Sequence, residues 1–272
     1  MMRKGLGLAL AGTLALGLLA GCSSGGDTAP AQEEAFSPSR YAAAINDIAR
    51  PAADKEADAL RKPGELLAFA QIRSGEVVGD YIMGGGYMTR LLAQATGASG
   101  RVYAFQPDEF IAFRPEYAAE QDAAIAPYAD NEGNPVRVFP LRGPIAAPAF
   151  PEPLDAIISV MNLHDLYLPA MPEGTADAAL AALYAALKPG GRLIVVDHRA
   201  VPGSGAAAAD SLHRMDEALA RAALERAGLV LEAESDLYAR PDDPRSANVF
   251  DAAIRGRTDQ FAWRLRKPES AQ

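Results

Sequence analysis

A short apolar run followed at once by three glycines is the feature that most constrains how this chain folds. Residues 76–82 include three β-branched side chains, which is typical of a buried strand. Gly84, Gly85 and Gly86 come next, and apolar residues then recur at the spacing of one helix face over residues 88–95. The sequence therefore predicts a strand, a glycine turn and a helix in succession.

This unit is suited to binding an anion. Glycines let a ligand approach the backbone, and the free N–H groups at the start of the helix face whatever lies there. Asp80 precedes Gly84 on the strand and suits a ligand that also has a cationic or hydroxyl-rich part. The dinucleotide pattern G-x-G-x-x-G is absent, since Thr89 occupies its third glycine position and Gln106 stands where its carboxylate is expected. A tight turn that binds nothing is the alternative.

The pattern acid-x-x-x-Gly-x-Gly at Asp80, Gly84 and Gly86 resembles the first motif of the class I S-adenosylmethionine-dependent methyltransferases. Other segments extend the resemblance over residues 60–267. The second strand of that family is similar to Gly100–Phe105, and its fourth strand is similar to Leu154–Val160. Its passage from a helix through a turn into the fifth strand is similar to Leu187–His198.

Two later segments resemble a bacterial subgroup of predicted methyltransferases: His213–Asp216, and Arg255–Asp259 ahead of a last strand at Phe261–Leu265. The resemblance implies an α/β fold with a doubly wound, Rossmann-like sheet of seven mostly parallel strands. Their order would be 3-2-1-4-5-7-6, with the last strand antiparallel and helices on both faces. The alternation of strand and helix patterns from Pro63 onward independently predicts a parallel sheet covered by helices.

Helix boundaries follow from local signals. Residues 41–61 predict two short helices broken at Pro51. Thr175 is predicted to cap a helix that Pro189–Gly190 closes, and Asp216 to cap another that ends before Gly228.

The chain departs from the family pattern at two places. Gln106 ends the second strand, where the family usually has an acid for the ribose hydroxyls. A third strand is predicted at residues 136–140, followed by a proline-rich loop at 140–153, and the acid often found near the adenine is absent there. Gln106 can still bond hydroxyl groups, although less strongly than a carboxylate.

The N-terminus has the pattern of a secretory signal. Arg3 and Lys4 precede an apolar run at residues 5–20, and Leu-Ala-Gly-Cys ends at Cys22. This ending resembles the bacterial lipoprotein signal, in which Cys22 becomes the lipidated first residue. An uncleaved anchor is the alternative, but the run is shorter than the roughly 20 apolar residues of a membrane span.

The expected organisation is a signal peptide at 1–21, a flexible tether at 22–40 and a methyltransferase-like domain at 41–272. Ser23 resembles the pattern that directs lipoproteins to the outer membrane, so we expect an exported protein anchored by lipid on the periplasmic side.

The composition limits the classes of molecule that this protein is expected to bind. The net charge is −9 with no cluster of Lys and Arg, which argues against nucleic acid because binding phosphates requires positive charge. The single cysteine excludes an intramolecular disulfide and a cysteine-based zinc cluster. Small molecules, lipids and proteins remain open. We expect a small-molecule substrate, membrane attachment through Cys22 and no obligate protein partner.

Ligands of open α/β sheets bind beyond the carboxyl ends of the strands. The polar residues expected there, in chain order, are Asn162, His164, Asp165, Asp197, His198 and His213. His164 is the candidate general base or orienting group, because histidine titrates near neutral pH. Asp165 and Asn162 join it as catalytic candidates, and the other three are expected to contact substrate or support the site.

Each histidine can instead be structural. A metal site built from the three histidines with Asp165 or Asp197 is conceivable from the ligand types, but the spacing matches no recognised zinc pattern, so no metal is predicted.

The resemblance implies S-adenosylmethionine as cofactor, with its ammonium group at Asp80, its carboxylate at Gly84, Gly85 and Gly86, and its ribose at Gln106. Methyl transfer depends mainly on positioning, and a base is needed only when the nucleophile arrives protonated. The sequence therefore favours a lipid-anchored methyltransferase of unknown acceptor. A methyltransferase fold that has lost transfer activity and binds another ligand or an envelope partner is the first alternative. A hydrolase or lyase using the His and Asp residues is the second.

Overall fold

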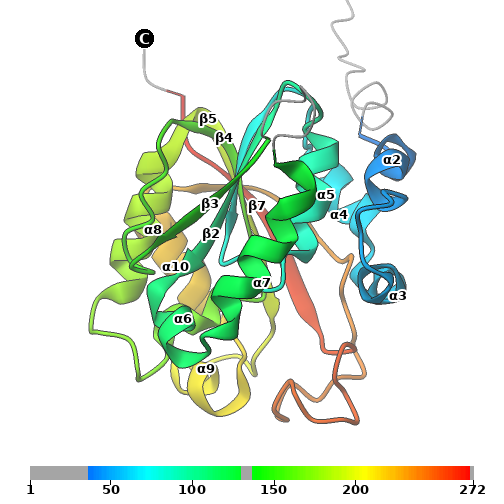
Figure 1. Ribbon diagram of the computed structural model, residues 1–272. Coiled ribbons are helices and arrows are strands. Elements are labelled where there is room, and N and C mark those ends of the chain that lie inside the picture. The colour runs from blue at the N-terminus through cyan, green and yellow to red at the C-terminus, as the bar shows by residue number, and fades with distance from the viewer. Residues whose placement is uncertain (1–35, 130–136, 270–272) are drawn as a thin grey trace, which may run out of the picture.

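The computed structural model describes residues 36–129 and 137–269, and its centre is a seven-stranded sheet (Figure 1). The strand order is β3-β2-β1-β4-β5-β7-β6, and β7 is antiparallel to both of its neighbours. This confirms the predicted fold class. The strands are β1 (Val77–Tyr81), β2 (Arg101–Pro107), β3 (Val138–Gly143), β4 (Leu154–Val160), β5 (Leu187–His198), β6 (Val230–Ser235) and β7 (Gln260–Arg266).

Helices cover both faces of the sheet (Figure 1). One buried cluster lies between the sheet and α2, α4 and α5, and a second lies between the sheet and α8 and α10. The helices are η1 (Pro38–Tyr41), α2 (Ala42–Ile45), α3 (Ala52–Arg61), α4 (Pro63–Ala70), α5 (Tyr87–Ala95), α6 (Asp108–Phe113), α7 (Glu116–Ile125), η2 (Ala126–Tyr128), η3 (His164–Tyr167), α8 (Thr175–Ala186), α9 (Ala207–Leu212) and α10 (Glu217–Arg226).

Strand β1 lies at the centre of the sheet, and all five of its residues are buried. Because successive side chains of a strand point to opposite faces, Val78 packs in the cluster under α4 and α5, whereas Val77 and Tyr81 pack in the cluster under α8 and α10. The hydroxyl of Tyr81 donates a hydrogen bond to the backbone oxygen of Ile145 at 2.7 Å. Tyr81 is therefore a core residue.

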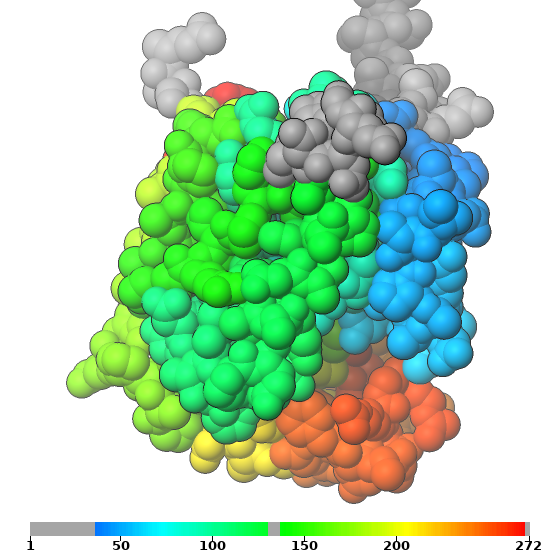
Figure 2. Space-filling view, viewed as in Figure 1, coloured from blue at the N-terminus to red at the C-terminus, as the bar shows by residue number. Residues whose placement is uncertain are grey.

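The N-terminal helices lie on one flank of the molecule, shown in blue in Figure 2. The predicted break at Pro51 is confirmed, since α2 ends at Ile45 and α3 begins at residue 52. Two contacts join α3 to α5. Arg90 donates two hydrogen bonds to Asp54, at 2.7 and 2.9 Å, and the Tyr87 hydroxyl donates one to Asp58 at 2.7 Å. Helix α3 is thereby fixed against the start of α5, which follows the glycine turn.

Helix boundaries agree with the sequence only in part. Asp216 caps α10 as predicted, because its carboxylate accepts hydrogen bonds from the backbone N–H groups of Ala218 and Leu219. Thr175 is not the cap of α8. Gly174 occupies the cap position with a φ of 82°, and the Thr175 hydroxyl donates to the backbone oxygen of Pro172. A preceding glycine in the left-handed region therefore replaces the expected side-chain cap.

Two prolines lie inside strands where the sequence predicted a turn and a loop. Pro189 and Gly190 belong to β5, and backbone bonds between residues 190–191 and Lys267 hold this part of the strand. Pro140 belongs to β3, which runs to Gly143 instead of ending at residue 140. Since β3 is an edge strand, a residue without an N–H group is tolerated there.

Within the described ranges, no helix has the length and hydropathy needed to cross a membrane. The signal peptide, most of the tether and Cys22 lie outside the described residues.

Candidate functional site

The glycine turn joins β1 to α5 at the carboxyl end of β1. Gly84 has a φ of +53°, and a Cβ atom added there would meet no heavy atom within 4 Å. Gly86 has a φ of +80°, and its added Cβ would lie 2.4 Å from the Cβ of Ala124. Packing against α7 therefore requires a glycine at Gly86, whereas the backbone of Gly84 borders free space. An added Cβ at Gly85 would come no nearer than 4.0 Å to Glu120.

Gln106 braces this turn from the end of β2. Its Oε1 atom accepts a hydrogen bond from the backbone N–H of Gly84 at 3.1 Å. The side chain is fully buried, and its Nε2 atom has no hydrogen-bond partner. A buried amide nitrogen without a partner is costly unless a ligand or water accepts its hydrogen bonds. Gln106 thus presents an unused donor beside an open backbone turn.

Asp80 is buried in β1, where its carboxylate accepts a hydrogen bond from the Thr89 hydroxyl at 2.5 Å. Burial raises the pKa of Asp80 to about 6, against the opposing effects of the Thr89 hydrogen bonds and the Arg90 charge. A carboxylate so poorly solvated gains from a cationic ligand group.

A pocket opens between β1, β4, α3 and α5. Arg61, the last residue of α3, lines it together with Asp80, and the Arg61 guanidinium lies 4.5 Å from the centre of the Tyr87 ring. The pocket thus offers one cation and one acid, which match the two ends of a zwitterion. Its lining residues are Arg61, Asp80, Ile82, Met83, Tyr87, Met88, Val160 and Asn162.

Strained backbone flanks this pocket. Ile82 and Met161 adopt φ angles of 62° and 61°, in a region that side chains other than glycine rarely enter. The Asn162 amide donates hydrogen bonds to the backbone oxygens of Ile82, at 3.0 Å, and Val160, at 2.9 Å. Asn162 therefore ties the ends of β1 and β4 together. Backbone strain of this kind concentrates at functional sites.

His164 lies in η3, just beyond β4, and is held by Asp197 from the end of β5. Its Nδ1 atom lies 2.8 Å from Oδ1 of Asp197, and its backbone N–H donates to Oδ2 of the same carboxylate. Burial lowers the pKa of His164, but the charge and hydrogen bond of Asp197 outweigh it and raise the pKa to about 9. The imidazolium form therefore predominates near neutral pH, and this form donates hydrogen bonds but does not accept a proton.

The other two histidines of the chain adjoin His164. The ring centre of His198 lies 6.1 Å from that of His164, and its Nδ1 atom lies 2.7 Å from the Thr258 hydroxyl. Burial lowers the pKa of His198 to about 4, so its ring is neutral. The ring of His213 lies 5.5 Å from His164 and packs edge-on to Phe250.

Asp165 completes this group. Its Oδ1 atom lies 3.5 Å from Nε2 of His164. Burial raises the pKa of the Asp165 carboxyl to about 6, although the neighbouring His164 charge lowers it.

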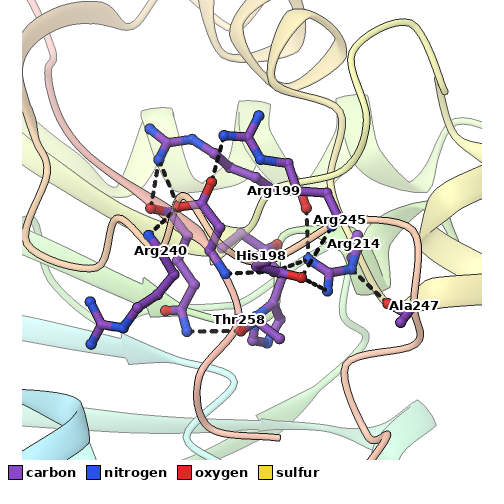
Figure 3. A network of polar contacts seen from close by, with 11 residues as sticks. His198, Arg199, Arg214, Arg240, Arg245, Ala247 and Thr258 are labelled. Carbon is purple, nitrogen blue, oxygen red and sulfur yellow. Dashed lines mark hydrogen bonds and ion pairs between the residues drawn. The ribbon is translucent and has the colours of Figure 1, made fainter. Parts of the chain in front are cut away.

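Arginines fix the C-terminal segment 236–259 against the histidines (Figure 3). Arg214 is fully buried and donates hydrogen bonds at 2.8 and 3.0 Å to the two oxygens of Asp243. Asp259 forms ion pairs with Arg199 and Arg245. Thr258, which contacts His198, directly precedes Asp259 of this network.

The predicted site residues thus form two groups at the carboxyl ends of the strands. Asp80 and Asn162 line the pocket, while Gly84 and its partner Gln106 lie at the adjoining glycine turn. The second group contains the three histidines with two acids, and its members are His164, Asp165, Asp197, His198 and His213.

Sequence reasoning missed two residues of these groups. Arg61 had no motif to mark it, because α3 lies outside the strand–turn–helix unit. Thr258 lies inside the Arg255–Asp259 segment whose resemblance was noted, but only the fold reveals its contact with His198.

Comparison with solved structures identifies the fold. A SAM-dependent methyltransferase from Aquifex aeolicus aligns with a TM-score of 0.50 and 18% identity over 85% of this chain and 99% of its own. The arsenic(III) S-adenosylmethionine methyltransferase CrArsM from Chlamydomonas reinhardtii aligns with a TM-score of 0.54 and 15% identity, over 85% and 73% of the two chains. The 4+2 cyclase SpnF aligns with a TM-score of 0.56 and 17% identity, over 78% and 82%.

No protein-family model matches the chain, and no curated protein matches its sequence. At identities of 15–18%, these neighbours establish the fold of the class I S-adenosylmethionine-dependent methyltransferases. Because a cyclase shares it, the fold alone does not establish methyl transfer.

Proposed function

We propose that this protein is an S-adenosylmethionine-dependent methyltransferase that acts on a small-molecule acceptor. The observation that carries the proposal is the unused, buried Nε2 donor of Gln106 beside the open turn at Gly84. Both lie at the carboxyl end of the central strands, where α/β sheets bind their ligands. The methyltransferase fold of the solved neighbours supports the same assignment.

The residues of the pocket fit this cofactor. Asp80 would bind the ammonium group, and Arg61, which lines the same pocket, would bind the carboxylate beside the glycine turn. Gln106 would donate its free N–H groups to a ribose hydroxyl. Bound S-adenosylmethionine supplies a methyl group on a sulfonium, and the chain's own contribution is to orient the ligand and exclude water.

Calorimetry tests this proposal directly. The full chain, purified in detergent, is titrated with S-adenosylmethionine and with S-adenosylhomocysteine, and we expect one molecule of either to bind. NAD serves as the control, because the third glycine and the acid of the dinucleotide pattern are absent. If neither sulfur compound binds, the result favours the alternative function. In that case the protein has this fold but has lost methyl transfer, and it binds another ligand or an envelope partner.

We also propose that the protein is exported and anchored by lipid on Cys22, on the periplasmic side of the envelope and in the outer membrane. The charged residues, apolar run and Leu-Ala-Gly-Cys ending of the N-terminus support this location. S-adenosylmethionine is a cytoplasmic metabolite, and a periplasmic protein has no obvious supply of it. The binding experiment therefore decides between methyl transfer and the binding of another ligand or partner.

A further inference from the structure

Three potential ligand atoms converge just beyond the end of β4. One ring nitrogen each from His164 and His213 and one carboxylate oxygen of Asp165 all lie within 4.8 Å of one another. His164 and Asp165 come from η3, whereas His213 directly follows α9, so only the fold brings them together. Each of these side chains is a recognised metal ligand.

We propose that His164, Asp165 and His213 bind a divalent transition-metal ion, with Zn²⁺ as the best match. Two imidazoles and one carboxylate form a donor set typical of zinc and of other first-row transition metals. Mg²⁺ and Ca²⁺ prefer oxygen ligands and are disfavoured by two nitrogen donors. The sequence spacing alone did not predict this site, because its two histidines are far apart in the chain.

The distances suit such an ion. Zinc binds nitrogen and oxygen at about 2.0–2.1 Å, which places two ligands of a tetrahedral site about 3.3 Å apart. Nε2 of His164 and Oδ1 of Asp165 are already 3.5 Å apart. His213 is only partly buried, so its ring has room to move the short remaining distance.

Asp197 orients the first ligand. Its Oδ1 atom is bonded to Nδ1 of His164, which leaves Nε2 of that ring facing Asp165. Metal-bound histidines commonly donate their other ring N–H to a carboxylate, because this fixes the tautomer and the direction of the ring. The Asp197–His164 pair has this arrangement, and a metal ion that binds Nε2 displaces the proton that this nitrogen otherwise carries near neutral pH.

The residues after His213 fix the third ligand. His213 has a φ of 52°, and the buried Arg214 next to it donates to the backbone oxygens of Arg199 and Ala247 as well as to Asp243 (Figure 3). Asp216 then caps α10. The His-Arg-Met-Asp segment therefore combines a ligand, a buried anchor and a helix cap.

Three protein ligands leave at least one coordination position open, as in catalytic zinc sites. The ring of His198 lies 6.1 Å from that of His164, and its Nδ1 atom is already bonded to Thr258. An acceptor bound beyond β4 and β5 would lie next to the ion. That last placement rests on the proposed methyltransferase function, whereas the metal site itself does not.

The experiment uses the full chain after removal of metals with a chelator. Zn²⁺ is titrated in competition with a chromophoric chelator, and we expect one equivalent to bind. Asp165→Asn and His213→Asn should each weaken binding at least about tenfold. Asparagine is chosen at His213 because it tolerates positive φ. Asp210→Asn, an exposed acid on α9 outside the ligand group, should change the affinity by about twofold or less.

A second readout is the visible spectrum of bound Co²⁺, which reports the ligands directly. Wild-type protein and Asp210→Asn should give the same spectrum, and the two ligand variants should lose it. Circular dichroism checks that each variant is folded. If one of the two ligand variants unfolds, the proposal is judged on the other. The proposal is overturned if wild type does not bind one equivalent of Zn²⁺, or if Mg²⁺ occupies the same site. It is also overturned if a folded ligand variant binds Zn²⁺ as tightly as wild type. Because S-adenosylmethionine is absent from both assays, its failure to bind is a separate result.

Discussion

Asp197 holds His164 at two points, with one carboxylate oxygen on the ring nitrogen Nδ1 and the other on the backbone N–H, both at 2.8 Å. The backbone N–H of His198 donates to the same carboxylate at 2.7 Å. Both acid and ring are buried. One side chain at the end of β5 thus fixes the position of η3 and the direction of the His164 ring.

We therefore expect Asp197→Ala to lower the free energy of unfolding by about 3–5 kcal/mol, since it leaves a buried cation and two backbone donors without their partner. Asp197→Asn keeps an oxygen acceptor and should cost less. Urea unfolding at pH 6 measures both. A loss below about 1 kcal/mol for the alanine variant, a typical single hydrogen bond, would contradict the anchoring role.

Gly84 provides a test of cofactor binding at the glycine turn. Gly84→Ala places a Cβ atom in free space, so its cost should be the left-handed backbone strain of about 1–2 kcal/mol. Binding of S-adenosylmethionine should fall strongly, because the methyl group occupies the space the ligand needs.

Gly174→Ala is the matched control. Gly174 also has positive φ and no atom within 4 Å of an added Cβ, but it caps α8 and is not part of the β1–α5 turn. The two variants should lose similar stability, as judged by thermal unfolding, and only Gly84→Ala should lose affinity in calorimetry. Equal affinities would place the ligand elsewhere.

Two substitutions of Gln106 should have opposite effects on the affinity for the cofactor. Gln106→Leu removes both the acceptor for Gly84 and the unused donor, so it should weaken cofactor binding and cost about 1–3 kcal/mol of stability. Gln106→Glu is nearly isosteric and supplies the acid that the family usually has there. It should strengthen cofactor binding, because charged acceptors form stronger hydrogen bonds with hydroxyls. Calorimetry compares the three proteins, and a tighter-binding leucine variant would refute the assigned contact.

The fold was predictable because its signals are local and repeat along the chain. The strands at 76–82 and 154–160 and the glycine turn between β1 and α5 were identified within a residue or two. Their order came from the resemblance to a family, since parallel pairing joins segments far apart in sequence. Errors arose where tertiary contacts overrode local preference, as at Pro140 in an edge strand and Pro189 in β5.

The candidate site was predictable as a list of residues but not as an arrangement. The rule that ligands bind at strand ends selected His164, Asp197 and His198. It could not show that Asp197 points at His164, or that His213 returns to the same place from α9. Such contacts depend on side-chain directions, which spacing along the chain does not encode.

Cys22 tests the proposed location. Cys22→Ser removes the thiol that would carry the lipid, so an unprocessed precursor should accumulate and labelling with radioactive palmitate should disappear. Ser24→Ala, two residues further along, should be processed and labelled normally. Equal labelling of the Cys22 variant and wild type would rule out lipidation at this residue.

Asp80 links the stability of the protein to its binding function. The pKa of Asp80 is raised by burial from 3.8 to about 6 in the folded chain. The folded state therefore binds this proton more tightly than the unfolded state does. Its contribution to stability is complete below about pH 4 and is lost as the pH rises through about 6.

Asp80→Asn is neutral at every pH and avoids this loss. With roughly two pKa units at 1.36 kcal/mol each, it should unfold at nearly the same free energy as wild type at pH 4 and be up to about 3 kcal/mol more stable at pH 8. Urea unfolding at the two pH values measures the difference. Asp122→Asn, which changes an exposed acid paired with Arg142, should show no comparable dependence on pH.

The same substitution should weaken binding of S-adenosylmethionine by about 1.5–3 kcal/mol, the range for a hydrogen bond to a charged group. A variant that is more stable yet binds less tightly is the expected signature of a carboxylate kept buried for a cationic ligand. Calorimetry at pH 8 supplies the binding half of the test. If Asp80→Asn gains stability but keeps full affinity, the buried acid serves something other than the ligand's ammonium group. If it loses both stability and affinity, its hydrogen bond to Thr89 dominates, and Asp80 is a structural residue of the β1–α5 junction.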